Sequence, residues 1–144
     1  MIKYFNIYPV ILAAALLSCS FSASAEDFVV IVNKLNPVET LSKSDVKKYF
    51  FKDLALWPNG SKVVSVDYKD ASALAKNFSM DILGIGLEEK NRKMISNVFS
   101  GRSTPPEQKD SEDEVIATVA ANKGAIGYVS VSSDTSKVKV IQLK

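Results

Sequence analysis

The residue types that carry most hydrolytic and metal chemistry are scarce in this chain of 144 residues, which has no histidine and a single cysteine, Cys19. This composition excludes a histidine base, a Cys-His nucleophile and a zinc site built from cysteine and histidine. The local spacing offers one nucleophile and base pairing, Ser72 with Lys69 or Lys76. A solvated lysine keeps its proton up to about pH 10 and is no base at neutral pH. We therefore expect a protein that is not an enzyme, with no catalytic residues and no cofactor.

An acidic run, residues 110–114, could be taken for a group of metal ligands. Ser111 and Glu114 have the spacing of a capping box, which opens a helix. Acidic side chains are stabilised near the unpaired amides of a first helical turn. We therefore expect a helix that starts at Ser111, ends at Gly124 with a glycine in the left-handed conformation, and binds no metal.

The first 25 residues are typical of a signal peptide. An apolar stretch over residues 8–17 is followed by Ala-Ser-Ala at 23–25, the small-x-small pattern that a signal peptidase cleaves. We expect export to the periplasm and cleavage after residue 25, so that 1–25 is a signal peptide and 26–144 is one domain. The alternative is a lipoprotein, in which Cys19 carries the lipid.

The charge of the chain is nearly balanced, with 18 lysines and arginines against 16 aspartates and glutamates. Neither nucleic acid nor an anionic membrane has a strong electrostatic reason to bind such a chain. About 120 residues support one hydrophobic core. We expect a single domain with no nucleic-acid partner.

The apolar patterns predict strands over residues 28–32, 62–68, 125–130 and 138–143, and helices over 42–50, from 70 or 72 to 84, 87–99 and 111–124. The segment 101–109, which contains Pro105-Pro106, is expected to be irregular. Alternation over 62–68 predicts a buried face of Val64, Val66 and Tyr68, with Ser65 and Asp67 on the opposite face. The helix over 87–99 is expected to bury four side chains in the core: Leu87, Met94, Ile95 and Val98.

This order of elements predicts an α/β fold, a three-layer single lobe whose mixed, mostly parallel sheet is flanked by helices. The continuous apolar run at 28–32 is typical of a strand buried on both faces, and such strands are usually parallel. The right-handed crossover rule then places the helix over 42–50 on one face of the sheet.

Two segments carry a resemblance to a known family. The first is VIVNKLNP at 30–37, followed by a helix and Trp57, and the second is NKGAIGYV at 122–129. In this order and spacing they resemble the substrate-binding proteins of phosphate ABC transporters, with Lys123 where proline is usual. The resemblance covers nearly all of residues 28–130 and implies a periplasmic-binding-protein-like fold of type 2.

That family binds an oxyanion between two lobes, partly at the amino end of a helix that follows a Ser-Gly-Thr turn. The resemblance places this turn on Ser72-Ala73-Leu74 and implies ligand-binding roles for Lys69, Asp70, Ser72 and Ala73. Amides at a helix start are unpaired, and the helix dipole favours negative charge there. Asp70 would either repel an anion or accept a proton from a protonated one.

The turn and the residues just before it depart from the family pattern at four positions, one of which is Ala71, where glycine is usual. Ala73 stands in place of glycine, and its Cβ limits how closely an anion approaches. Leu74 has no hydroxyl to donate, and Tyr68 replaces the expected arginine. Simple helix capping by Ser72 is the alternative interpretation.

The resemblance implies an exported solute-binding-protein-like domain that binds phosphate or a related oxyanion at a helix N-terminus for an ABC transporter, with a permease as its partner. A single lobe presents only half of a cleft, so a second copy in a homodimer or another chain would have to complete it. The alternative is a non-catalytic periplasmic interaction module that has lost ligand binding. Its candidate contacts for another periplasmic protein are Tyr68, Trp57 and the Pro105-Pro106 loop.

Overall fold

The computed structural model of the protein describes residues 27–144. The predicted signal peptide and Cys19 lie outside the described residues. Within the described part of the chain, no helix combines the length and the apolar character that a membrane span requires.

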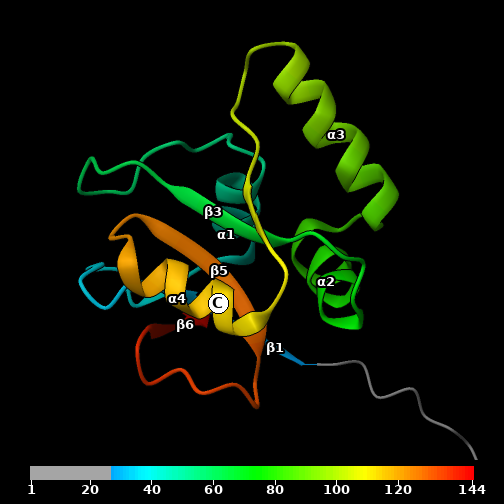
Figure 1. Ribbon diagram of the computed structural model, residues 1–144. Helices are drawn as coiled ribbons and strands as arrows, with labels where there is room; N and C mark the ends of the chain where they lie inside the picture. Colours follow the sequence, from blue (N-terminus) through cyan, green and yellow to red (C-terminus); the bar gives the residue numbers. More distant parts are fainter. Residues whose placement is uncertain (1–26) are drawn as a thin grey trace, which may run out of the picture.

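A six-stranded sheet with the order β2-β6-β1-β5-β3-β4 forms the centre of the fold (Figure 1). Three of its five pairings are parallel, namely β2 with β6, β3 with β4 and β3 with β5, while β1 is antiparallel to both β5 and β6. The strands are β1 Phe28–Val32, β2 Thr40–Leu41, β3 Val64–Tyr68, β4 Glu107–Lys109, β5 Ala125–Ser130 and β6 Lys139–Leu143. This is the mixed, mostly parallel sheet that the sequence predicts.

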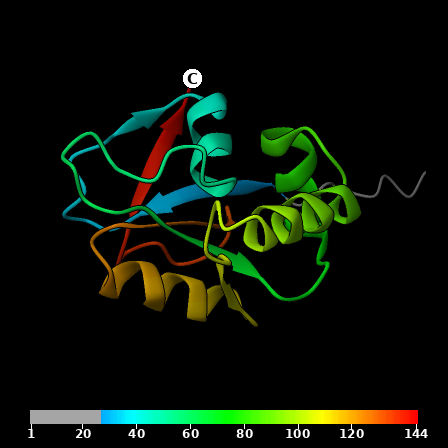
Figure 2. The same cartoon turned by 90° about the horizontal axis from the view of Figure 1, so that it is seen from above.

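Helices cover both faces of the sheet and give the predicted three layers. In Figure 2, α1 and α2 lie on one side of the sheet and α4 lies on the other, whereas α3 lies beside α2 and outside these layers. The helices are α1 Lys43–Phe50, α2 Ala73–Phe78, α3 Leu87–Phe99 and α4 Glu112–Ala121, and a π-helical turn, η1 Ser79–Leu83, continues α2.

Serine caps start three of these helices. The Ser42 hydroxyl accepts a hydrogen bond from the Asp45 amide at 3.0 Å, and the Ser111 hydroxyl accepts one from the Glu114 amide at 3.2 Å. These bonds satisfy amides that have no partner inside their own helix. Both predicted capping serines are therefore confirmed.

An aromatic cluster joins the sheet to α1 and α2. The rings of Tyr128 in β5 and Phe78 in α2 are stacked, with centroids 3.8 Å apart, and Phe50 of α1 lies 4.8 Å from Phe78. All three side chains are fully buried. Stacked and tilted aromatic pairs add to the stability that burial of their area provides.

Three expectations about the strands are wrong, concerning the direction of β1, residues 107–109 and the two faces of β3. Each depends on which elements lie beside the strand in the folded sheet. β1 is antiparallel to both of its neighbours and so runs opposite to β3, which means that these two predicted strands do not form a parallel β-α-β unit around α1. The strand directly before α1 is β2, and β2 runs in the same direction as β3. Residues 107–109, expected to be irregular, form the strand β4 because they pair with β3. Since β3 is covered on both faces, Ser65 and Asp67 are as buried as their apolar neighbours.

Gly124 is not the helix-terminating residue in the left-handed conformation that the sequence predicts. It is absent from the glycines with positive φ, and α4 ends at Ala121. A Cβ at Gly124 would lie 2.0 Å from the Lys62 carbonyl oxygen. The Gly124 carbonyl in turn accepts hydrogen bonds from the Trp57 indole and the Val64 amide, both at 2.9 Å. The backbone is thus packed too closely for any side chain at this position.

Gly124→Ala should therefore lower the free energy of unfolding by about 1–3 kcal/mol, because the segment that carries Lys62 and Trp57 must move to admit the methyl group. Urea unfolding followed by tryptophan fluorescence measures the change. Gly86→Ala is the matched control, since nothing lies within 4 Å of its added Cβ and its φ of −69° suits alanine. Both variants restrict the unfolded chain equally, so equal stabilities would contradict this account of Gly124.

Candidate functional site

The four residues implied by the family resemblance lie together on the surface, between the end of β3 and the first turn of α2. Lys69, Asp70, Ser72 and Ala73 are all exposed. The Lys69 ammonium donates a hydrogen bond to the Asp110 carboxylate at 2.9 Å, and this bond raises the pKa of Lys69. The positive charge of Lys69 is therefore already paired with a carboxylate.

Ser72 is the N-cap of α2, with φ −68° and ψ 162°. Its hydroxyl oxygen accepts a hydrogen bond from the Ala75 amide at 3.1 Å, which is the capping role expected from the alternative interpretation. The hydroxyl still has its own proton to donate. The first amides of α2, those of Ala73 and Leu74, have no acceptor within their helix. Capping and hydrogen bonding to an anion are thus compatible at Ser72.

Asp70 differs from the hydrogen-bond donors around it, because an ionised carboxylate is negatively charged and only accepts hydrogen bonds. Its side chain is exposed, and within residues 27–144 no ion pair includes its carboxylate. An ionised Asp70 repels a fully deprotonated oxyanion at the start of α2 but accepts a hydrogen bond from one that carries a proton.

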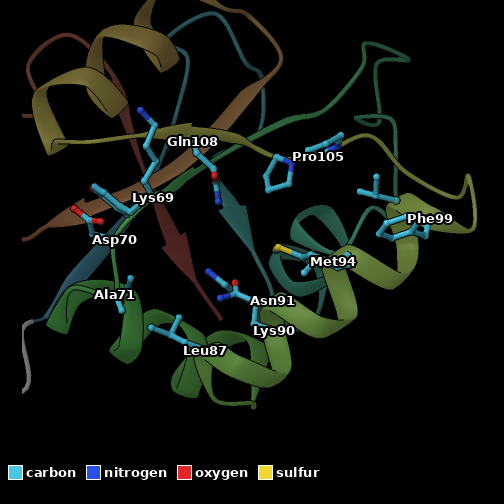
Figure 3. A pocket seen from close by; sticks show the side chains of 15 residues that line it. Lys69, Asp70, Ala71, Leu87, Lys90, Asn91, Met94, Phe99, Pro105 and Gln108 are labelled. Carbon is cyan, nitrogen blue, oxygen red and sulfur yellow. The ribbon is translucent and has the colours of Figure 1, made fainter.

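A cavity of about 420 Å³ lies next to these residues, between α3, the end of β3 and the segment that leads into β4. We call it the α3 groove. Figure 3 shows Asp70 at one end of it and Phe99 at the other, with Leu87, Met94 and Pro105 between them. Its walls are largely apolar, with the amides of Asn91 and Gln108 among them.

The prediction that α3 buries its apolar side chains in the core is wrong. Ile95 is 56% exposed and Phe99 is 88% exposed, while Leu87, Met94 and Val98 are only partly buried. The apolar stripe of α3 correctly predicts a helix. It faces a groove rather than the sheet because α3 lies outside the three layers.

The only buried residue of α3 is Lys90. Its ammonium donates a hydrogen bond at 2.7 Å to Oδ2 of Asp67 in β3, and both side chains are at least 95% buried. The other carboxylate oxygen of Asp67 accepts hydrogen bonds from the Tyr128 hydroxyl at 2.6 Å and from the Tyr68 amide at 2.9 Å. Asp67 is thus fully satisfied by groups from α3, β3 and β5.

Electrostatics reinforces this network. Burial raises the pKa of the Tyr128 hydroxyl far above its usual range, and the negative charge of Asp67 raises it further. Tyr128 therefore stays protonated and donates to Asp67, while the Tyr68 hydroxyl donates to the Tyr128 carbonyl at 2.7 Å. Sequence reasoning missed this network. The signals were a lysine within the apolar stripe of a helix and an aspartate in the middle of an apolar strand.

Two residues proposed as contacts for a partner protein belong to the core. Trp57 is 2% exposed and Tyr68 is 8% exposed. The Pro105-Pro106 loop, the third proposed contact, does line the α3 groove. Among residues 27–144, no group of three or more His, Cys, Asp or Glu side chains is arranged to hold a metal ion.

Several solved structures with the same fold are described as phosphate-transport proteins. A phosphate ABC transporter substrate-binding protein from Clostridium perfringens, solved with bound phosphate, matches with a TM-score of 0.65 and 22% identity over 81% of this chain and 44% of that one. An ABC-type phosphate transport receptor from Vibrio cholerae gives 0.64 and 19% identity over 81% and 45%. PstS from Borrelia burgdorferi gives 0.64 and 12% identity over 81% and 47%.

These likenesses confirm the predicted fold class, that of a single lobe of a periplasmic-binding-protein-like α/β protein. The chain spans less than half the length of each of these proteins. The sequence matches no protein-family model and no curated protein.

Breaking the ion pair between Lys90 and Asp67 should be costly. Lys90→Met leaves a buried carboxylate without its cation, and Asp67→Asn leaves a buried ammonium without its anion, so each should lower the free energy of unfolding by about 3–5 kcal/mol. The double variant should lose clearly less than the sum of the two single losses, as urea unfolding of all four proteins would measure.

Arg92→Met, on the exposed side of the same helix, is the matched control and should change the stability by less than about 0.5 kcal/mol. Additive losses from the two buried substitutions would refute the coupling between these side chains.

Proposed function

We propose that this chain is an exported solute-binding domain that holds phosphate, or a related oxyanion, at the start of α2 on behalf of an ABC transporter. The observation that carries the proposal is the position of Ser72 and Ala73, which follow β3 in a fold shared with phosphate-transport proteins. The donors are the Ser72 hydroxyl and the first amides of α2. A transporter permease and a periplasmic location belong to the same proposal.

Binding at this position should be weak. The described lobe offers one wall, so water remains on the open side of the ion and weakens each charge interaction. Lys69 is already paired with Asp110, and α2 is only six residues long. We expect affinity for phosphate in the millimolar range unless a second wall covers the ion.

Asp70 should give this site a preference among oxyanions. Phosphate carries a proton at neutral pH and can donate it to the Asp70 carboxylate, whereas sulfate has no proton to donate and is repelled. Phosphate should therefore bind more tightly than sulfate, even though the two ions have nearly the same shape.

A second candidate function is an interaction module without a small ligand. The observation in its favour is the α3 groove, where a helix leaves its apolar stripe uncovered. Under this hypothesis phosphate has no effect on the protein, and variants of the groove change its association with another macromolecule.

Isothermal calorimetry with inorganic phosphate, sulfate and a neutral solute separates these hypotheses. Ala73→Pro is the informative variant, because proline removes one amide donor yet suits the first position of a helix and the extended backbone of Ser72 before it. It should weaken phosphate binding several-fold without unfolding the protein. Asp70→Asn should strengthen sulfate binding and so reduce the preference for phosphate.

Lys43→Met provides the control, since it removes a surface charge that is paired with Asp81, outside the candidate site. Absence of heat and of any thermal shift at several millimolar phosphate would rule out the oxyanion proposal. Equal losses in Ala73→Pro and Lys43→Met would mean that the ion is attracted by general charge and not held at α2.

A further inference from the structure

We propose that Asn59 is a site of spontaneous deamidation, in which its side-chain amide is lost as ammonia and the hydrogen bonds of Ser61 promote the reaction. The products are aspartate and isoaspartate, and the only other reactant is water. This inference is independent of the candidate oxyanion site and of the α3 groove. It rests on the geometry of the turn formed by residues 57–61.

This turn is closed by two backbone hydrogen bonds. The Gly60 amide donates to the Trp57 carbonyl, and the Trp57 amide donates to the Ser61 carbonyl, both at 2.8 Å. Gly60 has a φ of +84°, a conformation that glycine adopts without strain. Asn59 and Gly60 are both exposed. Asparagine followed directly by glycine therefore lies at the accessible tip of the turn.

The reaction begins when the backbone nitrogen of Gly60 attacks Cγ of Asn59. A C–N bond forms, the attacking nitrogen gives its proton to solvent, and the Cγ–Nδ2 bond breaks as Nδ2 takes up a proton and leaves as ammonia. Water then opens the five-membered imide at either carbonyl, which gives aspartate or isoaspartate. No side chain crowds the attacking nitrogen, since nothing lies within 4 Å of the position that a Cβ of Gly60 would occupy.

Ser61 supplies two donors to the carbonyl that is attacked. Oδ1 of Asn59 accepts a hydrogen bond from the Ser61 amide at 3.0 Å and another from the Ser61 hydroxyl at 2.7 Å. Negative charge develops on this same oxygen as the Gly60 nitrogen attacks. Donors that already point at the oxygen stabilise that charge without rearrangement. The amide and hydroxyl of Ser61 thus act as an oxyanion hole for Asn59.

One hydrogen bond of the turn opposes the reaction. The Gly60 amide must release the Trp57 carbonyl before its nitrogen can attack. We therefore expect Asn59 to react more slowly in the folded protein than in the unfolded chain. This release is a local opening at the surface, which costs far less than unfolding of the whole domain. The folded protein should therefore still be converted.

Long incubation of the purified protein at mildly alkaline pH, followed by peptide mapping with mass spectrometry, tests the proposal. Asn59 should be converted to aspartate and isoaspartate. Ser61→Ala removes the hydroxyl donor to Oδ1 and should slow the conversion several-fold, whereas Ser61→Thr keeps a hydroxyl and should restore most of the rate. Ser44→Ala, at an exposed serine of α1, is the matched control and should leave the rate unchanged.

The modified protein provides a second measurement. Isoaspartate lengthens the backbone of the turn by one carbon, so the two hydrogen bonds of Trp57 cannot both keep their geometry. Trp57 is the only tryptophan of the chain, and its fluorescence should change in the modified fraction, which ion exchange separates by its added negative charge. An Asn59 that stays intact in the folded protein while the urea-unfolded chain is converted overturns the proposal. So does a Ser61→Ala variant that reacts as fast as wild type or faster, because the bonds of Ser61 would then restrain the amide instead of activating it.

Discussion

The arrangement of this lobe depends on one buried ion pair. α3 has a single buried residue, Lys90, and that residue is bonded to Asp67 in β3 at 2.7 Å. Two charges withdrawn from water are tolerated only when each is well paired, so the geometry of this contact is demanding. It holds α3 at one distance from the sheet, and this distance creates the α3 groove.

The same carboxylate connects the groove to the core. Asp67 accepts a hydrogen bond from Tyr128, and the ring of Tyr128 is stacked on Phe78 in α2, whose first turn carries Ser72 and Ala73. The candidate oxyanion site and the groove are therefore built on one continuous set of contacts through β3, β5 and α2. The two surfaces are chemically different, one a set of polar donors and the other an apolar channel, yet they share the same support.

Local signals in the sequence predict the elements of this fold well. The strands at β1 and β5 are continuous apolar runs, and the serines at positions 42 and 111 have the spacing of helix caps, so each needs only its neighbours in the chain to be recognised. β4 has no such signal, because Glu107-Gln108-Lys109 is polar and becomes a strand only by pairing with β3. The stripe of α3 predicts a helix but cannot tell what covers it. Lys90 and Asp67, 23 residues apart, reveal their pairing only when the sheet is assembled.

The order of strands also determines when this sheet can form as the chain emerges, amino end first, from a ribosome. β1 pairs only with β5 and β6, and β3 joins the rest of the sheet through β5. An emerging chain that has reached residue 120 therefore has no partner for β1 and no bridge between its two halves. Pairing of β1 with β5 closes a loop of about a hundred residues, from Phe28 to Ser130, and topologies with such distant pairings fold slowly. The central part of this sheet therefore forms only after β5 has been synthesised.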